Sequence, residues 1–295
     1  MVYEISETAM QIGELALRSM LYEVASHPSP GLVSPFSSGG HKDMDFFTFL
    51  RSSSALVFPV TLCAEIGLRE DPGLIFWKIR EIGIKAEERM FEVTSGVNTQ
   101  KGLLFLESII SSAAGHVLSR GKDVTPNDIS RAVSIICSGL TKNDFGKLKF
   151  KNVLTRGEKL YLEHGMKGIR GEVEAGLPTV MKYGLPALHE AMSAGLNDND
   201  IMVHVLISIM RAAEDTNIAG KFSVDVLNEV KSAAREAMNK GGMLTEEGRE
   251  IIWRMDSEFK ERGISPGGSA DLAAATLFVH LLSTCDIKLE SRKCF

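Results

Sequence analysis

Apolar residues recur at three- and four-residue spacing along most of the chain, which is the period of a helix with one buried side. Residues 6–26 show this period clearly, with Ala9, Ile12, Ala16 and Met20 on one side. The same period predicts further helices over 45–68, 71–93, 102–119, 126–140, 201–214, 223–240, 245–262 and 269–284. No alternating run of strand length lies between turn signals. The pattern predicts an all-α fold.

Prolines and glycines mark the connections between these helices. The segment 141–171 is more polar and contains several glycines, which predicts a long connection. Pro178 and Pro186 predict short helices within 172–195. The chain shows neither a repeat of fixed period nor a low-complexity linker. We therefore expect a single all-α domain over residues 1–295, with its site at converging helix ends and glycine-rich loops.

Composition narrows the choice of partners. The 295 residues are 44% hydrophobic and 24% charged, with a net charge of −5, so a polyanionic ligand would have to be held by local groups. The N-terminal segment is interrupted by Glu4, Glu7 and Glu14, and no uninterrupted apolar run reaches the roughly 18 residues of a spanning helix. The four cysteines form no CxxC pair, which predicts reduced thiols. We expect a cytoplasmic protein that binds neither nucleic acid nor a membrane.

The segment 27–51, HPSPGLVSPFSSGGHKDMDFFTFLR, is the first candidate for a site. Three prolines keep its backbone extended or turned, and three glycines allow close approach to a ligand. Ionisable residues then follow together, ahead of a buried apolar run: His41, Lys42, Asp43 and Asp45. A long loop with charges held against a hydrophobic anchor is typical of functional loops. The alternative is a solvated turn that caps the next helix.

Further polar motifs lie at predicted helix starts or glycine-rich joints, where backbone N–H groups are free to bind anions. They are GVNTQKG at 96–102, KGIRGEVE at 167–174, EDTN at 214–217 and SPGGSAD at 265–271. The candidate phosphate-binding residues in these motifs are Asn98, Lys101, Lys167, Arg170, Gly267, Gly268 and Ser269. The first motif is not a P-loop, because the Walker spacing and the preceding strand are missing. The alternatives are plain helix caps and, for Lys167 and Arg170, a solvated basic face.

Acidic and amide residues also occur in pairs spaced i, i+2: Asp43 with Asp45, Glu172 with Glu174, and Asp215 with Asn217. In mid-helix such side chains point to nearly opposite sides, whereas at a helix end or in a turn they can converge. Converging oxygen atoms would suit Mg²⁺, or a base beside a metal-bound phosphate. The histidines show no HExxH-like spacing, and no GxSxG motif supports nucleophilic catalysis.

Seven motifs in order closely resemble the triphosphoribosyl-dephospho-CoA synthase family, which makes the prosthetic-group precursor for citrate lyase and malonate decarboxylase. They are EVASHPSPGLV, GGHKDMDFFTFLRSS, GVNTQKG, TRGEKLY, HGMKGIRGEVEAGLP, EDTN and ISPGGSADLAAATLF, and they extend from about Glu23 to about Leu282. The resemblance implies an all-α pentosyltransferase. It would transfer the 5-triphosphoribosyl group of ATP to the ribose 2′-hydroxyl of 3′-dephospho-CoA and release adenine. The product would serve a transferase that modifies an acyl carrier protein.

The resemblance also suggests roles for the candidate residues, with Mg²⁺ as cofactor. The residues expected to supply metal ligation and the general base are Asp43, Asp45, Glu172 and Glu174. Asp215 and Asn217 would hold metal or ribose. The residues expected to bind other parts of the substrates, chiefly phosphate, are His41, Lys42, Asn98, Lys101, Lys167, Arg170, Gly267, Gly268 and Ser269. A homo-oligomer is compatible with the sequence.

Two positions depart from the family pattern. The family commonly continues EDTN with an Arg-Gly-Gly element, whereas this chain has Lys221 near the expected arginine, and Gln100 stands where His is common. Lys holds a phosphate as a point charge but lacks the bidentate fork of Arg. Two other classes therefore stay open: a Mg²⁺-dependent all-α nucleotide hydrolase, and a non-catalytic nucleotide- or CoA-binding helical protein.

Overall fold

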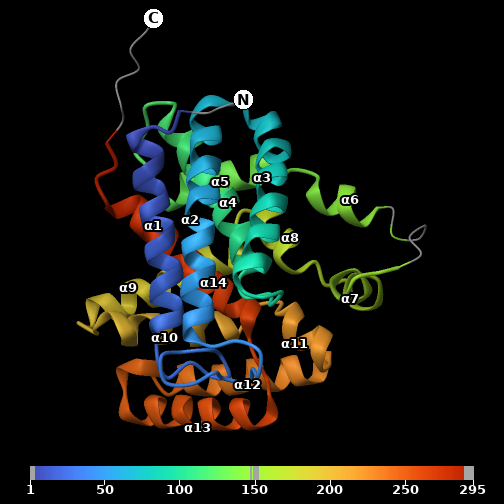
Figure 1. The fold of residues 1–295 in the computed structure, drawn as a ribbon. Coiled ribbons are helices and arrows are strands. Elements are labelled where there is room, and N and C mark those ends of the chain that lie inside the picture. The colour runs from blue at the N-terminus through green and yellow to red at the C-terminus, as the bar shows by residue number, and fades with distance from the viewer. Residues whose placement is uncertain (1–3, 147, 149–152, 289–295) are drawn as a thin grey trace, which may run out of the picture.

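The computed structural model describes residues 4–146, 148 and 153–288, and the regular elements in that part of the chain are helices (Figure 1). Ser34 and Ser37 form an isolated backbone bridge within a loop. The all-α prediction is therefore confirmed.

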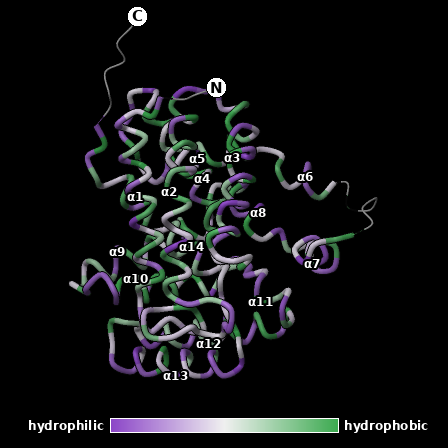
Figure 2. Tube along the Cα trace, viewed as in Figure 1, coloured by the Kyte–Doolittle hydropathy of each residue, from purple (hydrophilic) through white to green (hydrophobic). Residues whose placement is uncertain are grey.

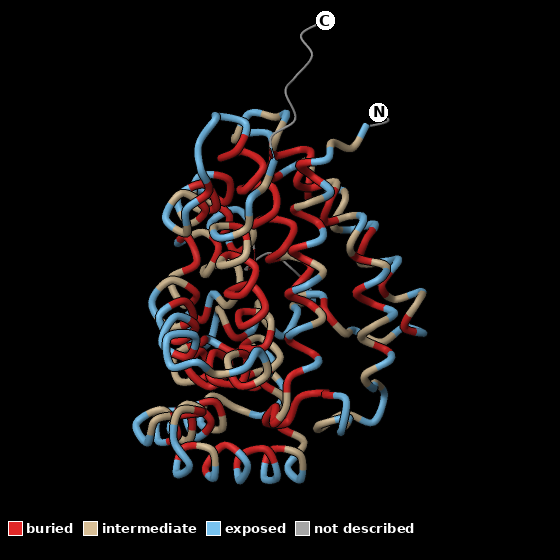
Figure 3. Tube along the Cα trace, turned by 90° about the vertical axis from the view of Figure 1, so that its left-hand side faces the viewer, coloured by how far each residue is buried: buried red, intermediate tan, exposed pale blue. Residues whose placement is uncertain are grey.

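Five long helices form the main layer: α1 (Glu7–Ala25), α2 (Phe46–Arg69), α3 (Pro72–Val93), α4 (Lys101–Leu118) and α14 (Gly267–Thr284). α2 packs against α1, α3 and α4, and α14 packs against α1 and α4, so segments from both ends of the chain meet. Most side chains of α4 and α14 are buried, as their apolar runs require. Figure 3 shows that buried residues concentrate inside the molecule and that exposed residues lie mainly at its outer turns. The starts of α4 and α14 lie close together, as the contact between Gly102 of α4 and the Asp271 carboxyl group of α14 shows.

A second group of helices covers one end of this layer (Figure 1). α10 (Asp198–Met210) packs against α14, α9 (Leu185–Ser193) and α12 (Val224–Asn239), and α12 packs against α13 (Glu246–Arg262). α12 and α13 bury most of their apolar residues and expose most of their charged residues, as their periodicity predicts. Figure 2 shows hydrophobic and hydrophilic positions alternating along these helices.

Shorter elements join the two groups: α5 (Pro126–Ile136), α6 (Leu140–Phe145), α7 (Arg156–His164), α8 (Gly168–Glu174), a π-helical turn (Val180–Gly184), α11 (Thr216–Lys221) and a 3₁₀ turn (Gly242–Leu244). The long connection predicted over 141–171 contains α7, which begins with a reciprocal cap between Thr155 and Glu158. Its sequence gives a weak helical signal, because Leu160 is its one buried residue.

Most predicted helix bounds agree closely with the structure, and two differ. α5 ends at Ile136 rather than near 140, because Gly139 takes a left-handed φ of 76° and starts α6. α10 ends at Met210 rather than near 214, because Asp215 caps a separate short helix, α11.

One helix of the described residues, α2, is long and apolar enough to span a bilayer by length and composition alone. Its sequence has no uninterrupted apolar run of spanning length, because Arg51 and Glu65 are charged. α2 packs between α1, α3 and α4 and buries polar residues such as Ser52 and Ser53. These neighbours cover part of its apolar surface, while Phe47 and Phe58 stay exposed.

The proline- and glycine-rich loop after α1 is packed against the protein. The Gly40 N–H donates a hydrogen bond to the Gly31 carbonyl at 3.0 Å and closes the loop. The His27 ring contacts the rings of Phe36 and Trp253, with centroid distances of 5.1 and 5.0 Å. These contacts fix the first part of the loop beside α13. The alternative of a solvated turn that caps the next helix describes the charged end of the loop, where Lys42 and Asp43 are exposed and Asp45 caps α2.

Candidate active site

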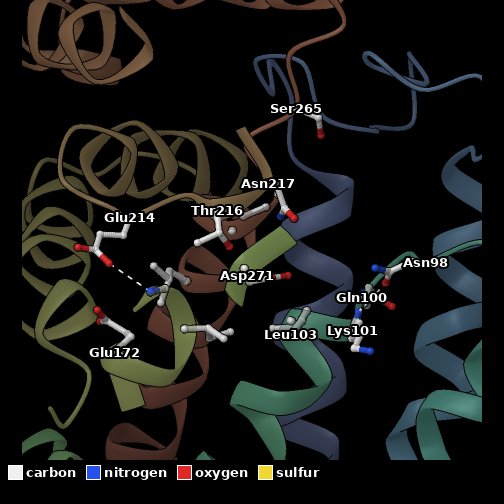
Figure 4. Close-up of a pocket in the computed structure, with 18 of the residues that line it drawn as sticks. Asn98, Gln100, Lys101, Leu103, Glu172, Glu214, Thr216, Asn217, Ser265 and Asp271 are labelled. Carbon is white, nitrogen blue, oxygen red and sulfur yellow. Dashed lines mark hydrogen bonds between the residues drawn. The ribbon is translucent and has the colours of Figure 1, made fainter. Parts of the chain in front are cut away.

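A cavity of about 820 Å³ opens where several helix ends meet (Figure 4). Its wall is formed by the last turn of α1, the first turns of α4, α11 and α14, and part of α8. The motifs at 96–102, 167–174, 214–217 and 265–271 all contribute residues to this wall. The structure thus brings together segments that are far apart in the sequence.

Two acidic residues, Asp271 and Glu23, line the cavity, and Asp271 is labelled in Figure 4. A Cβ atom on Gly102 would lie 2.0 Å from Oδ2 of Asp271, so the carboxyl group sits directly against the start of α4. Burial raises the pKa of Glu23 to about 7. Burial also raises the pKa of Asp271 well above its usual value, the charges of Glu23 and Asp215 raise it further, and a hydrogen bond from the Leu103 N–H opposes the rise. Both carboxyl groups therefore resist ionisation.

Asp215 caps two helices at once. Its Oδ1 accepts hydrogen bonds from the N–H groups of Asn217 and Ile218 at 3.1 and 3.3 Å, at the start of α11. Its Oδ2 accepts from the N–H and the hydroxyl of Ser269 at 2.8 and 3.0 Å, at the start of α14. The sequence predicted metal binding for Asp215 and phosphate binding for the Ser269 amide. The structure shows these groups bonded to each other instead.

Glu172 and Glu174 do not converge on one ligand. Glu172 lines the cavity, but its carboxylate accepts hydrogen bonds from the N–H and hydroxyl of Thr179 at 2.7 and 2.9 Å. Burial raises the pKa of Glu172, and the Thr179 donors oppose that rise. Glu174 accepts from the N–H and hydroxyl of Thr141 at the start of α6 and does not line the cavity. The predicted convergence of this pair is wrong, because each residue binds a different helix start.

Glu214 also binds a helix start. Its carboxylate accepts hydrogen bonds from the N–H groups of Lys167 and Gly168 at 3.1 and 3.2 Å, and so caps α8 (Figure 4). The carboxylate therefore occupies the amide groups that the sequence offered to a phosphate at this joint.

Basic side chains line the cavity: Lys101, Arg156, Lys167 and Lys221. Lys101 forms an ion pair with Glu87, and Lys221 donates a hydrogen bond to the Gly263 carbonyl at 3.1 Å. Within the described part of the chain, no carboxylate pairs with the side chains of Lys167 or Arg156. These two cations are therefore available to an anionic ligand.

Arg170, which we expected to bind phosphate, pairs with Asp144 at 2.6 Å and does not line the cavity. Its guanidinium also lies over the Phe145 ring, 5.7 Å from the centroid. Arg170 thus joins α8 to α6.

The charged residues of the first loop reach the cavity only in part. His41 lines it and hydrogen-bonds through Nε2 to the Ser265 hydroxyl at 2.8 Å. Asp45 forms a reciprocal N-cap with the third residue of α2, and Asp43 and Lys42 are exposed. None of these last three residues lines the cavity. The expected meeting of both aspartates with the other site residues is wrong, because Asp45 is held by its own helix and Asp43 faces solvent.

Uncharged candidate residues that line the cavity are Asn98, Asn217, Gly267 and Gly268. The Asn98 side chain accepts a hydrogen bond from the Lys101 N–H at 3.3 Å. A Cβ atom on Gly268 would lie 3.2 Å from the Asp215 carboxylate, so this glycine makes room for the cap of α14.

Sequence reasoning did not identify Glu23 and Asp271 as catalytic candidates. Asp271 appeared in the last motif as a candidate cap, and Glu23 was only the first residue of another motif. The sequence feature that could have identified them is an acidic residue on a helix side that is otherwise apolar. Glu23, for example, shares the buried side of its helix with Met20 and Val24. That signal identifies a buried acid and does not say what the acid faces.

Comparison with known proteins gives a consistent result. The family model described as ATP:dephospho-CoA triphosphoribosyl transferase matches residues 9–288. A relative from Malonomonas rubra, described as a 2-(5''-triphosphoribosyl)-3'-dephosphocoenzyme-A synthase, is 37% identical over 286 residues, which cover 95% of this chain and 90% of the relative. A relative of the same description from Lactiplantibacillus plantarum is 39% identical over 272 residues, covering 90% of this chain and 95% of the relative.

A crystal structure from Archaeoglobus fulgidus, described as a triphosphoribosyl-dephospho-CoA synthase, matches with 14% identity and a TM-score of 0.48, covering 80% of this chain and 99% of that chain. The family model extends over nearly the whole sequence, and both curated relatives align along most of their length. On that evidence, the chain belongs to the ATP:dephospho-CoA triphosphoribosyl transferase family.

Proposed function

We propose that this chain transfers the 5-triphosphoribosyl group of ATP to the ribose 2′-hydroxyl of 3′-dephospho-CoA and releases adenine. Family membership supports this choice of substrates. The observation that carries the proposal is one cavity lined by basic side chains and by two carboxyl groups, Glu23 and Asp271, whose pKa values are raised by burial. Polyphosphate substrates need cations, and displacement at a sugar carbon uses carboxyl groups near the reacting atoms.

The reaction forms one bond and breaks one. The 2′-oxygen of dephospho-CoA attacks C1 of the ATP ribose, and the bond from C1 to adenine breaks, with its electron pair leaving on the purine. The hydroxyl loses one proton and adenine gains one. The triphosphate stays on the transferred ribose, so the protein must hold the phosphates without cleaving them.

Lys167 and Arg156 suit the triphosphate, because neither is committed to a carboxylate among the described residues. Lys221 adds a third positive charge to the same wall. It stands near the position at which the family commonly has arginine, and its ammonium group can balance phosphate charge without a bidentate contact.

We propose that Mg²⁺ enters with ATP as its triphosphate complex. Among the described residues, no group of three or more Asp, Glu, His or Cys side chains is arranged to hold a metal ion. The oxygens of Asp215, an expected ligand, already accept hydrogen bonds from Asn217, Ile218 and Ser269. Proteins commonly bind Mg²⁺ through one or two carboxylates together with substrate phosphates, so the phosphates would supply most of the ligands.

The test is incubation with ATP and Mg²⁺, with and without 3′-dephospho-CoA, followed by detection of adenine and of a product heavier by triphosphoribose. Adenine release that depends on dephospho-CoA supports the transfer. Turnover of ATP without dephospho-CoA would identify a nucleotide hydrolase instead. Binding without turnover would identify a non-catalytic nucleotide-binding protein.

We further propose that the reaction takes place in the cytoplasm and that its product passes to a transferase that modifies an acyl carrier protein. The family resemblance supports this route, with citrate lyase or malonate decarboxylase as the enzyme finally served.

A further inference from the structure

We propose that Glu23 and Asp271 are the acid–base pair of the transfer: the Glu23 carboxylate takes the proton of the attacking hydroxyl, and the Asp271 carboxylic acid gives a proton to the leaving adenine. This inference rests on the proposed function and assigns its two proton transfers to named groups.

Glu23 has the environment of a general base. It lies in the last turn of α1, lines the cavity and is 9% exposed. None of the described residues hydrogen-bonds to its carboxyl group, so its lone pairs are free for a substrate hydroxyl. Burial raises its pKa to about 7, close to the value at which a base combines ionisation with proton affinity near neutral pH.

Asp271 has the environment of a general acid. Burial and the charges of Glu23 and Asp215 raise its pKa well above its usual value, which favours its protonated form. Its carboxyl group lies against the start of α4, where the Leu103 N–H hydrogen-bonds to it. The positive end of the α4 dipole stabilises the anion that remains once the proton has been given to adenine.

The other carboxylates of the cavity wall have structural partners. The acidic residues that line the cavity are Glu23, Glu172, Glu214 and Asp271. Glu172 accepts two hydrogen bonds from Thr179, and Glu214 accepts two from the start of α8. Glu23 and Asp271 are the two that remain.

The charged and titratable groups facing this pair come from the helices packed around the start of α14. Glu107 on α4 accepts a hydrogen bond from the Ser19 hydroxyl at 2.7 Å, and burial raises its pKa well above the usual value, which opposes its ionisation. Asp215, ahead of α11, is buried and bound by N–H donors. Lys101 lies in the wall at the start of α4 and is paired with Glu87. Among the described residues, neither Glu23 nor Asp271 forms an ion pair with a cation, which favours retention of one proton by the pair.

This assignment conserves protons through the reaction. At the start, Glu23 is ionised and Asp271 is protonated. Glu23 takes the 2′-hydroxyl proton as the new C–O bond forms, and Asp271 protonates adenine as the C–N bond breaks. Transfer of one proton from Glu23 to Asp271 after product release restores the pair.

The test is the pH dependence of kcat/KM for adenine release, together with kcat, because kcat/KM reports the pKa values of the free protein. The unmodified protein should give a bell-shaped profile that rises through pH of about 7 as Glu23 ionises and falls at higher pH as Asp271 ionises. Glu23→Gln and Asp271→Asn should each lower kcat by about 100-fold or more. The first variant should lose the rising limb, and the second should lose the falling limb.

The matched control is Asp256→Asn. Asp256 is a buried carboxylate on α13 that pairs with Lys260 and does not line the cavity, so kcat and the profile should be unchanged. Glu23→Asp keeps a carboxyl group and should keep the rising limb of the profile. This variant provides the test if Glu23→Gln does not fold. Circular dichroism and ATP binding by calorimetry check each variant.

Turnover near the unmodified value in Glu23→Gln or Asp271→Asn overturns the acid–base assignment while leaving the transfer intact. Loss of turnover with both limbs unchanged also overturns it, because a structural role would lower kcat without changing the titration. If the unmodified protein releases no adenine in the presence of dephospho-CoA, the proposed function fails and the assignment fails with it.

Discussion

Asp215 and Ser269 are joined by two hydrogen bonds to a single carboxylate oxygen, with the Ser269 N–H at 2.8 Å and its hydroxyl at 3.0 Å from Oδ2 of Asp215. The other oxygen of Asp215 caps α11. One buried side chain therefore fixes the start of α14 against α11. Asp271 lies a short distance further along α14, so its position in the cavity depends on this cap.

Asp215→Ala should lower the free energy of unfolding by about 2–4 kcal/mol, because it leaves several buried N–H groups without acceptors. Urea unfolding followed by circular dichroism measures the loss. Asp225→Ala, which removes an exposed acid from the first turn of α12, is the control and should cost much less. Equal losses of unfolding free energy in the two variants would show that the hydrogen bonds of Asp215 stabilise the fold no more than an ordinary surface carboxylate does.

Gly102→Ala should reduce kcat by about 100-fold, because misplacement of a reacting group by about 1 Å can have an effect of that size. The added Cβ would lie 2.0 Å from Oδ2 of Asp271, so the carboxyl group would have to move. Gly83→Ala in α3 is the matched control, since a Cβ there meets nothing within 4 Å. Alanine should make α3 more stable and leave kcat unchanged. Equal kcat in both variants would contradict this account of Gly102.

Glu23→Gln should make the fold more stable above neutral pH. The pKa of Glu23 is raised from 4.5 to about 7, so the fold favours its protonated form. This favourable contribution is complete below the unfolded pKa and is lost as pH rises through the folded pKa. The loss is at most about 3 kcal/mol. Unfolding midpoints in urea at about pH 5 and about pH 8 should show a steeper decline for the unmodified protein, and parallel declines would refute the buried-acid description.

Lys167→Met and Arg156→Met should each raise KM for ATP by about tenfold, the effect of losing one charge-assisted hydrogen bond. Arg170→Met is the control, because Arg170 pairs with Asp144 outside the cavity. It should leave KM unchanged and lower stability slightly. A larger KM effect at Arg170 than at Lys167 would favour the phosphate-binding role expected from the sequence over the structural one.

The helices themselves could be predicted from the sequence, because periodic burial leaves a strong pattern in α1, α12 and α13. Short elements such as α7 could not, since α7 buries one residue and its N-cap residue, Thr155, is exposed. Local pattern carries little information where a helix contributes so little to the core.

The site could be predicted only to the level of segments. A carboxylate at a helix start can cap its own helix, as Asp45 does, cap another helix, as Glu214 does, or face a ligand. These choices depend on which helix ends meet in space, and local spacing is the same for all of them. The sequence therefore located the joints, while the division of roles among Asp45, Asp215 and Asp271 required the fold.

Glu214 and Asp215 are consecutive residues, yet together they hold the starts of α8, α11 and α14. α8 carries Glu172 and α14 carries Asp271, so both contribute to the cavity wall. The segment 211–215 after α10 thus connects the starts of α8 and α14 through two adjacent carboxylates, so a displacement of α8 would be transmitted to α14. A phosphate group bound near Lys167 would therefore affect, through Glu214 and Asp215, how the Asp271 carboxyl group is placed relative to the ribose of ATP.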